Sequence, residues 1–160
     1  MSRRVPLELR LSPRKPSSPW SARNVRETDV DALAILLHAA FRGTIDDEGE
    51  TFADARAEIE RTLSGGYGRF LPEASFAIEE GEFLASACLV SWFEPHDAPL
   101  VVFSMTRPEA RRRGMARFLL QRSIDALIAR RYSRLTLIVT EGNDAAQALY
   151  ESLGFTPIVV

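Results

Sequence analysis

The sequence predicts a single mixed α/β domain in which helices flank a mostly antiparallel sheet. Its 160 residues suffice for one domain with a real core and are too few for two ordinary domains. Segments with the two-residue period of strands alternate with segments that have the 3.6-residue period of amphipathic helices. Three strand-like segments also follow one another with short turns between them, which favours an antiparallel meander.

The overall composition excludes several classes of protein. An apolar fraction of 46% and a charged fraction of 26% are close to soluble averages, and no run is long enough to span a bilayer. A net charge of -2 argues against a protein that coats nucleic acid, because such binding neutralises many phosphates. Cys88 is the only cysteine, so there is no disulfide framework, and with His38 and His96 it cannot form a closed zinc site. We therefore expect a cytoplasmic protein with no metal, nucleic-acid or membrane contact.

The chain divides into an N-terminal extension, residues 1–22, and one domain over residues 23–160. Within the extension, Val5 to Leu11 alternates well enough for a strand, and the prolines of residues 12–19 favour a loop. An Arg- and Ser-rich N-terminus also occurs in transit peptides, but the alternation favours the strand.

Two helices are predicted next. The first begins after Thr28 with Asp29 as a plausible N-cap, and its apolar residues recur at spacings of three and four. His38 falls off that apolar stripe, so we expect it to be a solvated surface residue. The second helix begins at Thr51, which can cap it, and ends at the glycines 65–66.

The rest of the chain alternates strands and helices. Residues 75–93 contain two apolar runs joined at Glu79 to Glu82, a hairpin signal, and residues 100–105 form the third strand of the meander. A helix is predicted from Gly114 onward. Residues 135–140 are almost all apolar, as in a strand covered on both faces, and a last helix and a short strand over 155–160 follow.

The segment around Gly114 has the features of a phosphate site. A strand that runs into a glycine turn and a helix aims free backbone N–H groups and the positive end of the helix dipole at one point. Gly114 lets the backbone approach a ligand, Ala116 keeps the first turn uncrowded, and Arg111 to Arg113 add charge-assisted hydrogen bonds. Taken alone, the cluster is equally typical of charges that solvate a helix start.

Two motifs together resemble the acetyl-CoA signature of the GNAT superfamily of N-acyltransferases. The first is Arg111-x-x-Gly114-x-Ala116, and the second runs from Asn143 to Phe155 with Ala146, Leu149, Tyr150, Leu153 and Gly154 at the matching positions. The order of elements agrees over roughly residues 23–160. The resemblance implies the GNAT-like fold and an N-acetyltransferase that uses acetyl-CoA as acyl donor, with a primary amine attacking directly in a ternary complex.

The resemblance also implies a cofactor site. A bulged strand end at Met105 and Thr106 would offer backbone hydrogen bonds to the pantetheine arm, and the Gly114 turn would surround the pyrophosphate. Asn143 would contact the cofactor or only cap its helix. The implied cofactor-binding residues are Met105, Thr106, Arg111, Arg112, Arg113, Gly114, Met115, Ala116, Arg117, Asn143 and Ala146.

Tyr150 is the implied catalytic residue, because in the family this position lies near the cofactor sulfur. A phenol with a pKa of about 10 can protonate a departing thiolate whose conjugate acid has a pKa of about 8.5, which makes it a credible general acid. The alternative is an apolar helix position that fills the core.

The group that accepts the proton of the amine stays open, because an alkylammonium has a pKa of about 10.4 and several side chains can serve. Acidic residues in the loop between the first two helices hint at a cationic acceptor, although acidic runs are usually solvated surface. The candidates are Asp46, Asp47, Glu48, Glu50, Glu94 and His96.

The chain ends six residues after Gly154, whereas relatives commonly carry a longer last strand. In those relatives the longer strand contributes residues to the wall of the acceptor site. In this chain the N-terminal extension or a second subunit can supply that wall, so a homodimer is possible. Trp20 and Trp92 can belong to such a contact. Two other functions remain open. A CoA-binding sensor or subunit would bind without catalysis, and a nucleic-acid binder that uses Arg107 to Arg134 would show a steep salt dependence.

Overall fold

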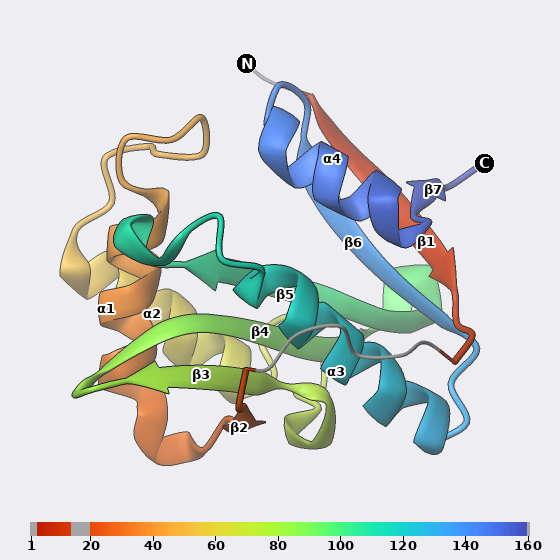
Figure 1. Ribbon diagram of the computed structural model, residues 1–160, viewed down its shortest axis with the longest axis horizontal. Coiled ribbons are helices and arrows are strands. Elements are labelled where there is room, and N and C mark those ends of the chain that lie inside the picture. Colours follow the sequence, from red (N-terminus) through yellow and green to blue (C-terminus); the bar gives the residue numbers. More distant parts are fainter. Residues whose placement is uncertain (1–2, 14–19, 160) are drawn as a thin grey trace.

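The computed structural model describes residues 3–13 and 20–159. Its α-helices are α1 (Val30–Phe41), α2 (Phe52–Leu63), α3 (Met115–Ala129) and α4 (Asp144–Leu153). Its strands are β1 (Arg4–Arg10), β2 (Arg23–Asn24), β3 (Phe76–Glu80), β4 (Phe83–Phe93), β5 (Ala98–Thr106), β6 (Arg134–Thr140) and β7 (Thr156–Pro157). Within the described residues the strands form one seven-stranded sheet in the order β2-β3-β4-β5-β6-β1-β7 (Figure 1). The predicted mixed α/β class with a mostly antiparallel sheet is confirmed.

The predicted meander of β3, β4 and β5 is present, and the β3–β4 turn uses Gly81 with φ 63°. In contrast, β5 and β6 are parallel and pair only at Leu100↔Thr136 and Val101↔Leu137. Beyond these pairs the two strands diverge toward their carboxyl ends (Figure 1). The gap between them interrupts the sheet and exposes an edge of each strand.

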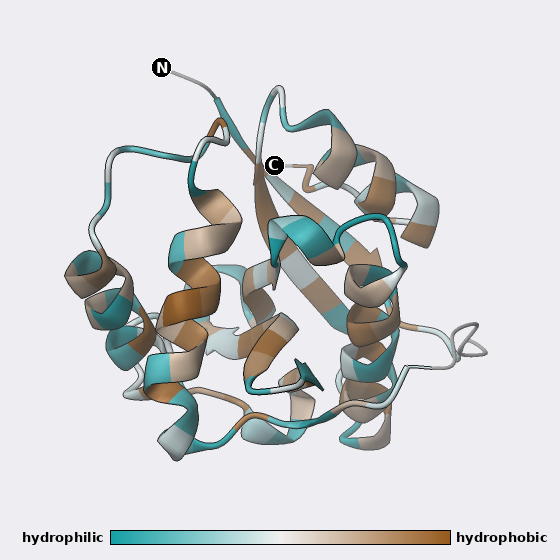
Figure 2. Ribbon diagram, turned by 60° about the vertical axis from the view of Figure 1, so that its left-hand side comes forward, coloured by the Kyte–Doolittle hydropathy of each residue, from teal (hydrophilic) through white to brown (hydrophobic). Residues whose placement is uncertain are grey.

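The helices cover the two faces of the sheet in pairs. α3 and α4 lie in front of it and α1 and α2 behind it in Figure 1. Each pair encloses its own hydrophobic core, one of them including Leu119 and Leu153 and the other Leu33 and Ile59. Along the helices, hydrophobic and hydrophilic residues alternate, as expected for elements with one buried side (Figure 2). No helix in the described part of the chain has the length and apolar character needed to cross a membrane.

The first two helices begin as predicted, by different means. Thr51 caps α2 in a reciprocal capping box with Asp54. Asp29 occupies the N-cap position of α1, but its side chain makes no cap hydrogen bond. Its carboxylate instead accepts two hydrogen bonds of 2.9 Å from the Arg23 guanidinium and one of 2.7 Å from the Arg26 backbone N–H. This ion pair ties the start of α1 to β2.

The N-terminal strand β1 lies inside the sheet rather than beside it. It pairs antiparallel with β6 from Arg4↔Thr140 to Arg10↔Arg134, and Leu7 and Glu8 pair with β7 on its other side. The last strand itself is only two residues long. The N-terminal segment therefore fills the position next to β6, between β6 and β7. The loop predicted over residues 12–19 falls mostly on residues 14–19, outside the described residues.

Candidate active site

The gap between β5 and β6 opens into a cleft of about 1230 Å³. α1, the loop over residues 42–51 and α2 line one side of the cleft, and β5, β6 and α4 line the other. Tyr150, Asn143 and Ala146 on α4 reach it, as does His38 on α1. The expectation for His38 is corrected, because its side chain is half-buried against the cleft and not freely solvated.

The bulge in β5 lies earlier than expected, three residues before Met105. Met105 and Thr106 pair regularly with β4, and the register shifts instead at Val102, which no residue of β4 faces. Val102 follows directly on Val101, the last residue of β5 that pairs with β6. A bulge bends its strand, so its position explains where β5 turns away from β6 and the cleft begins.

The hydrogen-bond pattern between β4 and β5 shows which main-chain groups of β5 point into the gap. The Arg107 N–H donates to the Ala85 carbonyl of β4 at 2.9 Å. Because hydrogen-bonded pairs alternate along antiparallel strands, the Met105 groups also face β4, whereas those of Ser104 and Thr106 face the gap. The sequence analysis did not identify Ser104. Which residues of β5 turn their main-chain groups toward the gap depends on the position of the bulge, and the sequence does not reveal that position.

The N-terminus of α3 is open toward solvent. Gly114 is its N-cap with φ 81°, and no side chain caps the helix. The N–H groups of Met115, Ala116 and Arg117 begin the helix and have no acceptor within it. Gly114 is exposed, and a Cβ atom there would meet nothing within 4 Å, so the side on which a side chain would project is open. The positive end of this 15-residue helix therefore lies at an exposed turn.

Two of the neighbouring arginines are held by other elements. The Arg111 guanidinium donates to the Ala40 carbonyl at the end of α1 at 2.5 Å. Arg113 donates to both carboxylate oxygens of Glu80, at 3.1 and 2.7 Å, and stacks over the Trp20 ring at 5.0 Å. Arg113 lowers the pKa of Glu80, so this pair is ionised at neutral pH. These two side chains fix the turn between β5 and α3.

The other two arginines differ from this pair. Arg117 donates to the Ser152 hydroxyl of α4 and so joins α3 to α4. Arg112 is exposed with φ 64°, and no hydrogen bond or ion pair engages its side chain among the described residues. Arg112 is thus the member of the cluster most available to an anion at this turn.

Tyr150 lines the cleft from α4. Its side chain is 9% exposed and its ring packs edge-on against Phe155, with 5.9 Å between centroids. Burial, with a smaller contribution from Cys88, raises the pKa of Tyr150 to about 12, and Ser104 acts in the opposite direction. The phenol is therefore protonated at every physiological pH and can act as a hydrogen-bond donor toward the cleft.

Asn143 caps its own helix. Its Oδ1 atom accepts a hydrogen bond from the Ala146 N–H at 3.3 Å, one of the two roles left open for this residue. Gly154 ends the helix with φ 102°, as its position in the motif predicts.

The acidic loop residues line the cleft, and two of them also hold the loop together. Asp47 accepts from the backbone N–H groups of Gly43 and Gly49, both at 2.8 Å, and these bonds lower the pKa of Asp47. Glu50 accepts from the Glu48 N–H at 3.2 Å. Asp46 differs from them, because its partner is the Thr140 hydroxyl at the end of β6.

The other two proton-acceptor candidates lie outside this cleft. Glu94 accepts from the Trp92 indole N–H at 2.7 Å. His96 lies within hydrogen-bond distance of the Thr136 hydroxyl, 2.9 Å from its Nδ1, and burial together with Arg134 lowers its pKa. Neither residue is among those that line the cleft. Both belong to the end of the sheet where β5 and β6 are still paired.

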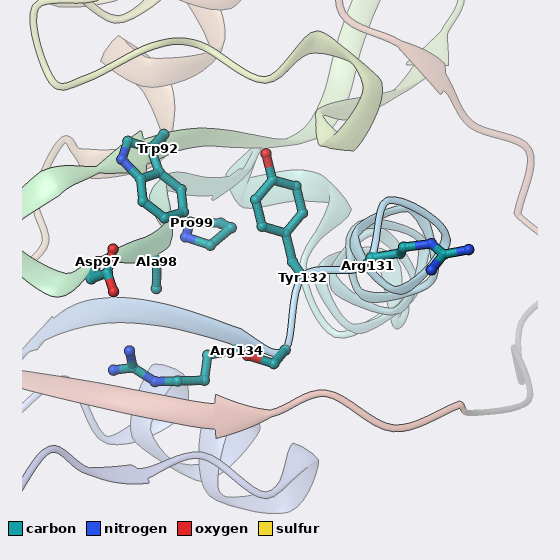
Figure 3. Close-up of a pocket in the computed structure, with 8 residues that line it drawn as sticks. Trp92, Asp97, Ala98, Pro99, Arg131, Tyr132 and Arg134 are labelled. Carbon is teal, nitrogen blue, oxygen red and sulfur yellow. The ribbon is translucent and has the colours of Figure 1, made fainter.

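A second, smaller cavity of about 170 Å³ lies at that closed end. Figure 3 shows the Tyr132 ring turned toward Trp92 and Pro99, while the Arg131 side chain points away from them. The Trp92 and Tyr132 ring centroids are 6.0 Å apart. None of the residues expected to bind cofactor lines this cavity, whereas Asn143 and Ala146 line the larger cleft together with Tyr150. The larger cleft is therefore the candidate active site.

Cys88 is buried in the middle of β4, and burial raises the pKa of its thiol to about 11. A thiol that is both inaccessible and protonated is a poor nucleophile. We expect a colorimetric disulfide reagent at pH 8 to leave the native protein unlabelled and to label one thiol after unfolding in guanidinium. Rapid labelling of the native protein would contradict this placement.

Comparison with known proteins agrees with this geometry. The Acetyltransferase (GNAT) family matches residues 31–155. Mycothiol acetyltransferase of Beutenbergia cavernae is 47% identical over 53 residues, which are 33% of this chain and 18% of that protein. The ribosomal protein bS18-alanine N-acetyltransferase of Salmonella typhimurium is 47% identical over 53 residues, 33% of this chain and 36% of that protein. The chain thus spans well under half the length of these curated relatives.

Solved structures share the fold at low sequence identity. A GCN5-related N-acetyltransferase from Sphaerobacter thermophilus superposes with a TM-score of 0.73 at 20% identity, over 97% of this chain and 48% of the other. The ribosomal-protein-S18-alanine N-acetyltransferase from Escherichia coli gives a TM-score of 0.68 at 24% identity, over 87% and 79%. AAC(6')-Iy, solved with a bisubstrate analog containing CoA, gives 0.63 at 16% identity, over 89% and 96%. The diverging strands, the open helix N-terminus and the family match together show that this chain belongs to the GNAT acetyltransferase family.

Proposed function

We propose that this chain is an N-acetyltransferase that moves an acetyl group from acetyl-CoA to a primary amine by direct attack in a ternary complex. The observation that carries the proposal is the gap between β5 and β6, which the phenol of Tyr150 borders from α4. Reactants that enter this gap from opposite faces of the sheet would meet beside the phenol. Such positioning lowers the barrier to a two-substrate transfer, because it converts a bimolecular step into an effectively unimolecular one.

The residues on the α3 side fit a CoA molecule. The uncapped N–H groups that follow Gly114, together with the Arg112 side chain, suit a pyrophosphate. The main-chain groups of Ser104 and Thr106 that face the gap suit the amides of a pantetheine arm, which would add to the strand edge. When bound, acetyl-CoA supplies an activated thioester carbonyl. In this proposal Met105 supports the edge from the core, and Ala146 walls the gap.

Tyr150 is proposed to assist the departing sulfur. With the pKa raised to about 12, complete proton transfer to a thiolate of pKa about 8.5 would be uphill by several kcal/mol. Tyr150 therefore acts best as a hydrogen-bond donor that stabilises charge on sulfur, with the proton moving as the bond to carbon breaks. A backbone N–H of Ser104 or Thr106 can polarise the carbonyl in the same gap.

The charges of the cleft favour a cationic acceptor. Six carboxylates and three arginines line it, a formal balance of six negative against three positive charges. Such a balance draws an ammonium-bearing molecule toward the cleft and repels an anionic one. The carboxylates are Asp46, Asp47, Glu48, Glu50, Asp54 and Glu58, and the arginines are Arg4, Arg42 and Arg61.

Calorimetric titration with acetyl-CoA at two salt concentrations tests the proposal. We expect one-to-one binding that weakens moderately with salt, since only a few phosphates are contacted. Release of free thiol in the presence of an amine panel then measures transfer. Absence of binding heat would refute the proposed donor, and binding without thiol release from any amine would favour a CoA-binding module.

A further inference from the structure

The loop between α1 and α2 is anchored across the cleft on β6. The Thr140 hydroxyl donates to the Asp46 Oδ1 atom at 2.5 Å, although the two residues are 94 positions apart in the sequence. Next to this bond, Ile45 lies against the β6–α4 turn, where a Cβ atom on Gly142 would come within 3.0 Å of the Ile45 Cδ1 atom. The loop therefore places one carboxylate at the carboxyl end of β6.

This carboxylate shares the cleft with the catalytic phenol. Asp46, Thr140 and Tyr150 all line it. Burial is the main cause of the raised pKa of Tyr150, and the charge of Asp46 makes the smallest contribution to it. Thr140 is 9% exposed, so the anchoring bond is shielded from solvent. An anion held rigidly in partly dry surroundings attracts a cation more strongly than a solvated surface acid does.

Asp46 also keeps a free oxygen, unlike its neighbours. Within residues 3–13 and 20–159, no hydrogen bond or ion pair reaches the Asp46 Oδ2 atom. Asp47 is occupied by two backbone donors of its own loop. Glu58 accepts from the Tyr67 hydroxyl at 2.5 Å and lies 3.5 Å from the Arg61 guanidinium. Among these three acids, Asp46 alone combines an anchor at the end of β6 with a free acceptor atom in the cleft that Tyr150 also lines.

We propose that Asp46 binds the ammonium group of the acceptor through its Oδ2 atom and so positions the amine beside Tyr150. Thr140 holds the carboxylate in place through Oδ1. The inference rests on the proposed function, since it assigns the acceptor subsite of the same cleft. A carboxylate suits a charged ammonium better than the neutral amides of a pantetheine arm. The loop also lies on the α1–α2 face, away from the open end of α3.

Three variants separate this role from a merely structural one. Asp46→Asn keeps an oxygen that can accept from Thr140 but removes the charge. Thr140→Val removes the anchor and keeps the charge. Glu141→Gln is the matched control, because it removes one negative charge from an exposed side chain next to Thr140 that does not line the cleft.

The test is an NMR titration of the isotope-labelled protein with n-butylammonium, and with n-butanol as the uncharged probe of similar size. We expect saturable shifts of the residue 44–47 amides with the amine alone, and an affinity about tenfold lower in Asp46→Asn, the loss of one charge-assisted hydrogen bond. Glu141→Gln should match the wild type, and Thr140→Val should lose less than Asp46→Asn.

Several results would overturn the inference. One is an Asp46→Asn affinity equal to wild type, and another is the absence of amine-dependent shifts in the loop. A larger loss in Thr140→Val than in Asp46→Asn would make Asp46 only a loop anchor. Acetyl-CoA titration of the same variants separates the two proposals. Weaker acetyl-CoA binding in Asp46→Asn alone would assign Asp46 to the donor, whereas no binding by the wild type would refute the proposed function itself.

Discussion

Replacing Tyr150 by phenylalanine is expected to lower kcat about a hundredfold while leaving the affinity for acetyl-CoA unchanged, the lower end of what a positioned acid contributes. The ring and its edge-on packing against Phe155 would be retained, so only the hydroxyl is lost. Because stabilisation of the departing sulfur develops only in the transition state, the loss should fall on kcat and not on binding. Steady-state thiol release and calorimetry measure the two quantities separately.

Tyr132→Phe is the matched control for this change. Its hydroxyl lies 3.5 Å from the Arg69 guanidinium, and its ring lines the smaller cavity away from the gap. We expect it to keep wild-type kcat. The raised pKa of Tyr150 adds a second readout, since ionisation of this phenol should not lower kcat between pH 7 and 10 and should begin to do so only as the pH approaches 12. Undiminished turnover in Tyr150→Phe would remove this residue from the chemistry.

Features that depend on neighbours in the sequence could be predicted. The capping box of Thr51 and Asp54 spans four residues, the hairpin at Gly81 needs one residue with positive φ, and Gly154 ends α4 with a positive φ as well. In each case the backbone conformation and its partner belong to one short segment. The spacing of the hydrophobic residues then distinguishes helices from strands, and this is enough to predict the order of the elements and the fold class.

Features that depend on partners far along the chain could not be predicted. Nothing within residues 4–10 indicates that β1 inserts between β6 and β7, because strand alternation does not specify which strand it pairs with. The bulge at Val102 is a property of the β4–β5 pair. Because it lies at Val102 and not at Met105, the main-chain groups that face the gap include those of Ser104. Arg113 pairs with Glu80, 33 residues away. A run of arginines therefore predicts local positive charge and not the direction of each side chain.

Replacing Gly114 by tryptophan is expected to weaken the binding of acetyl-CoA about a hundredfold. Gly114 has open space where a side chain would project, so an indole at this N-cap can occupy the place that we propose for the pyrophosphate. Loss of two charge-assisted hydrogen bonds would cost about 3 kcal/mol, or about a hundredfold in Kd. Calorimetric titration under wild-type conditions measures this loss.

Gly114→Ala is the control that separates the effect of side-chain size on affinity from the effect of backbone strain. Either residue must adopt φ 81°, at a cost of about 1 kcal/mol in stability, so thermal unfolding should shift similarly in both variants. Only tryptophan fills the space in front of the helix, because an alanine Cβ meets nothing within 4 Å. Equal losses of affinity in both variants would therefore attribute the effect to strain at the turn, and wild-type affinity in Gly114→Trp would exclude the N-terminus of α3 as the pyrophosphate site.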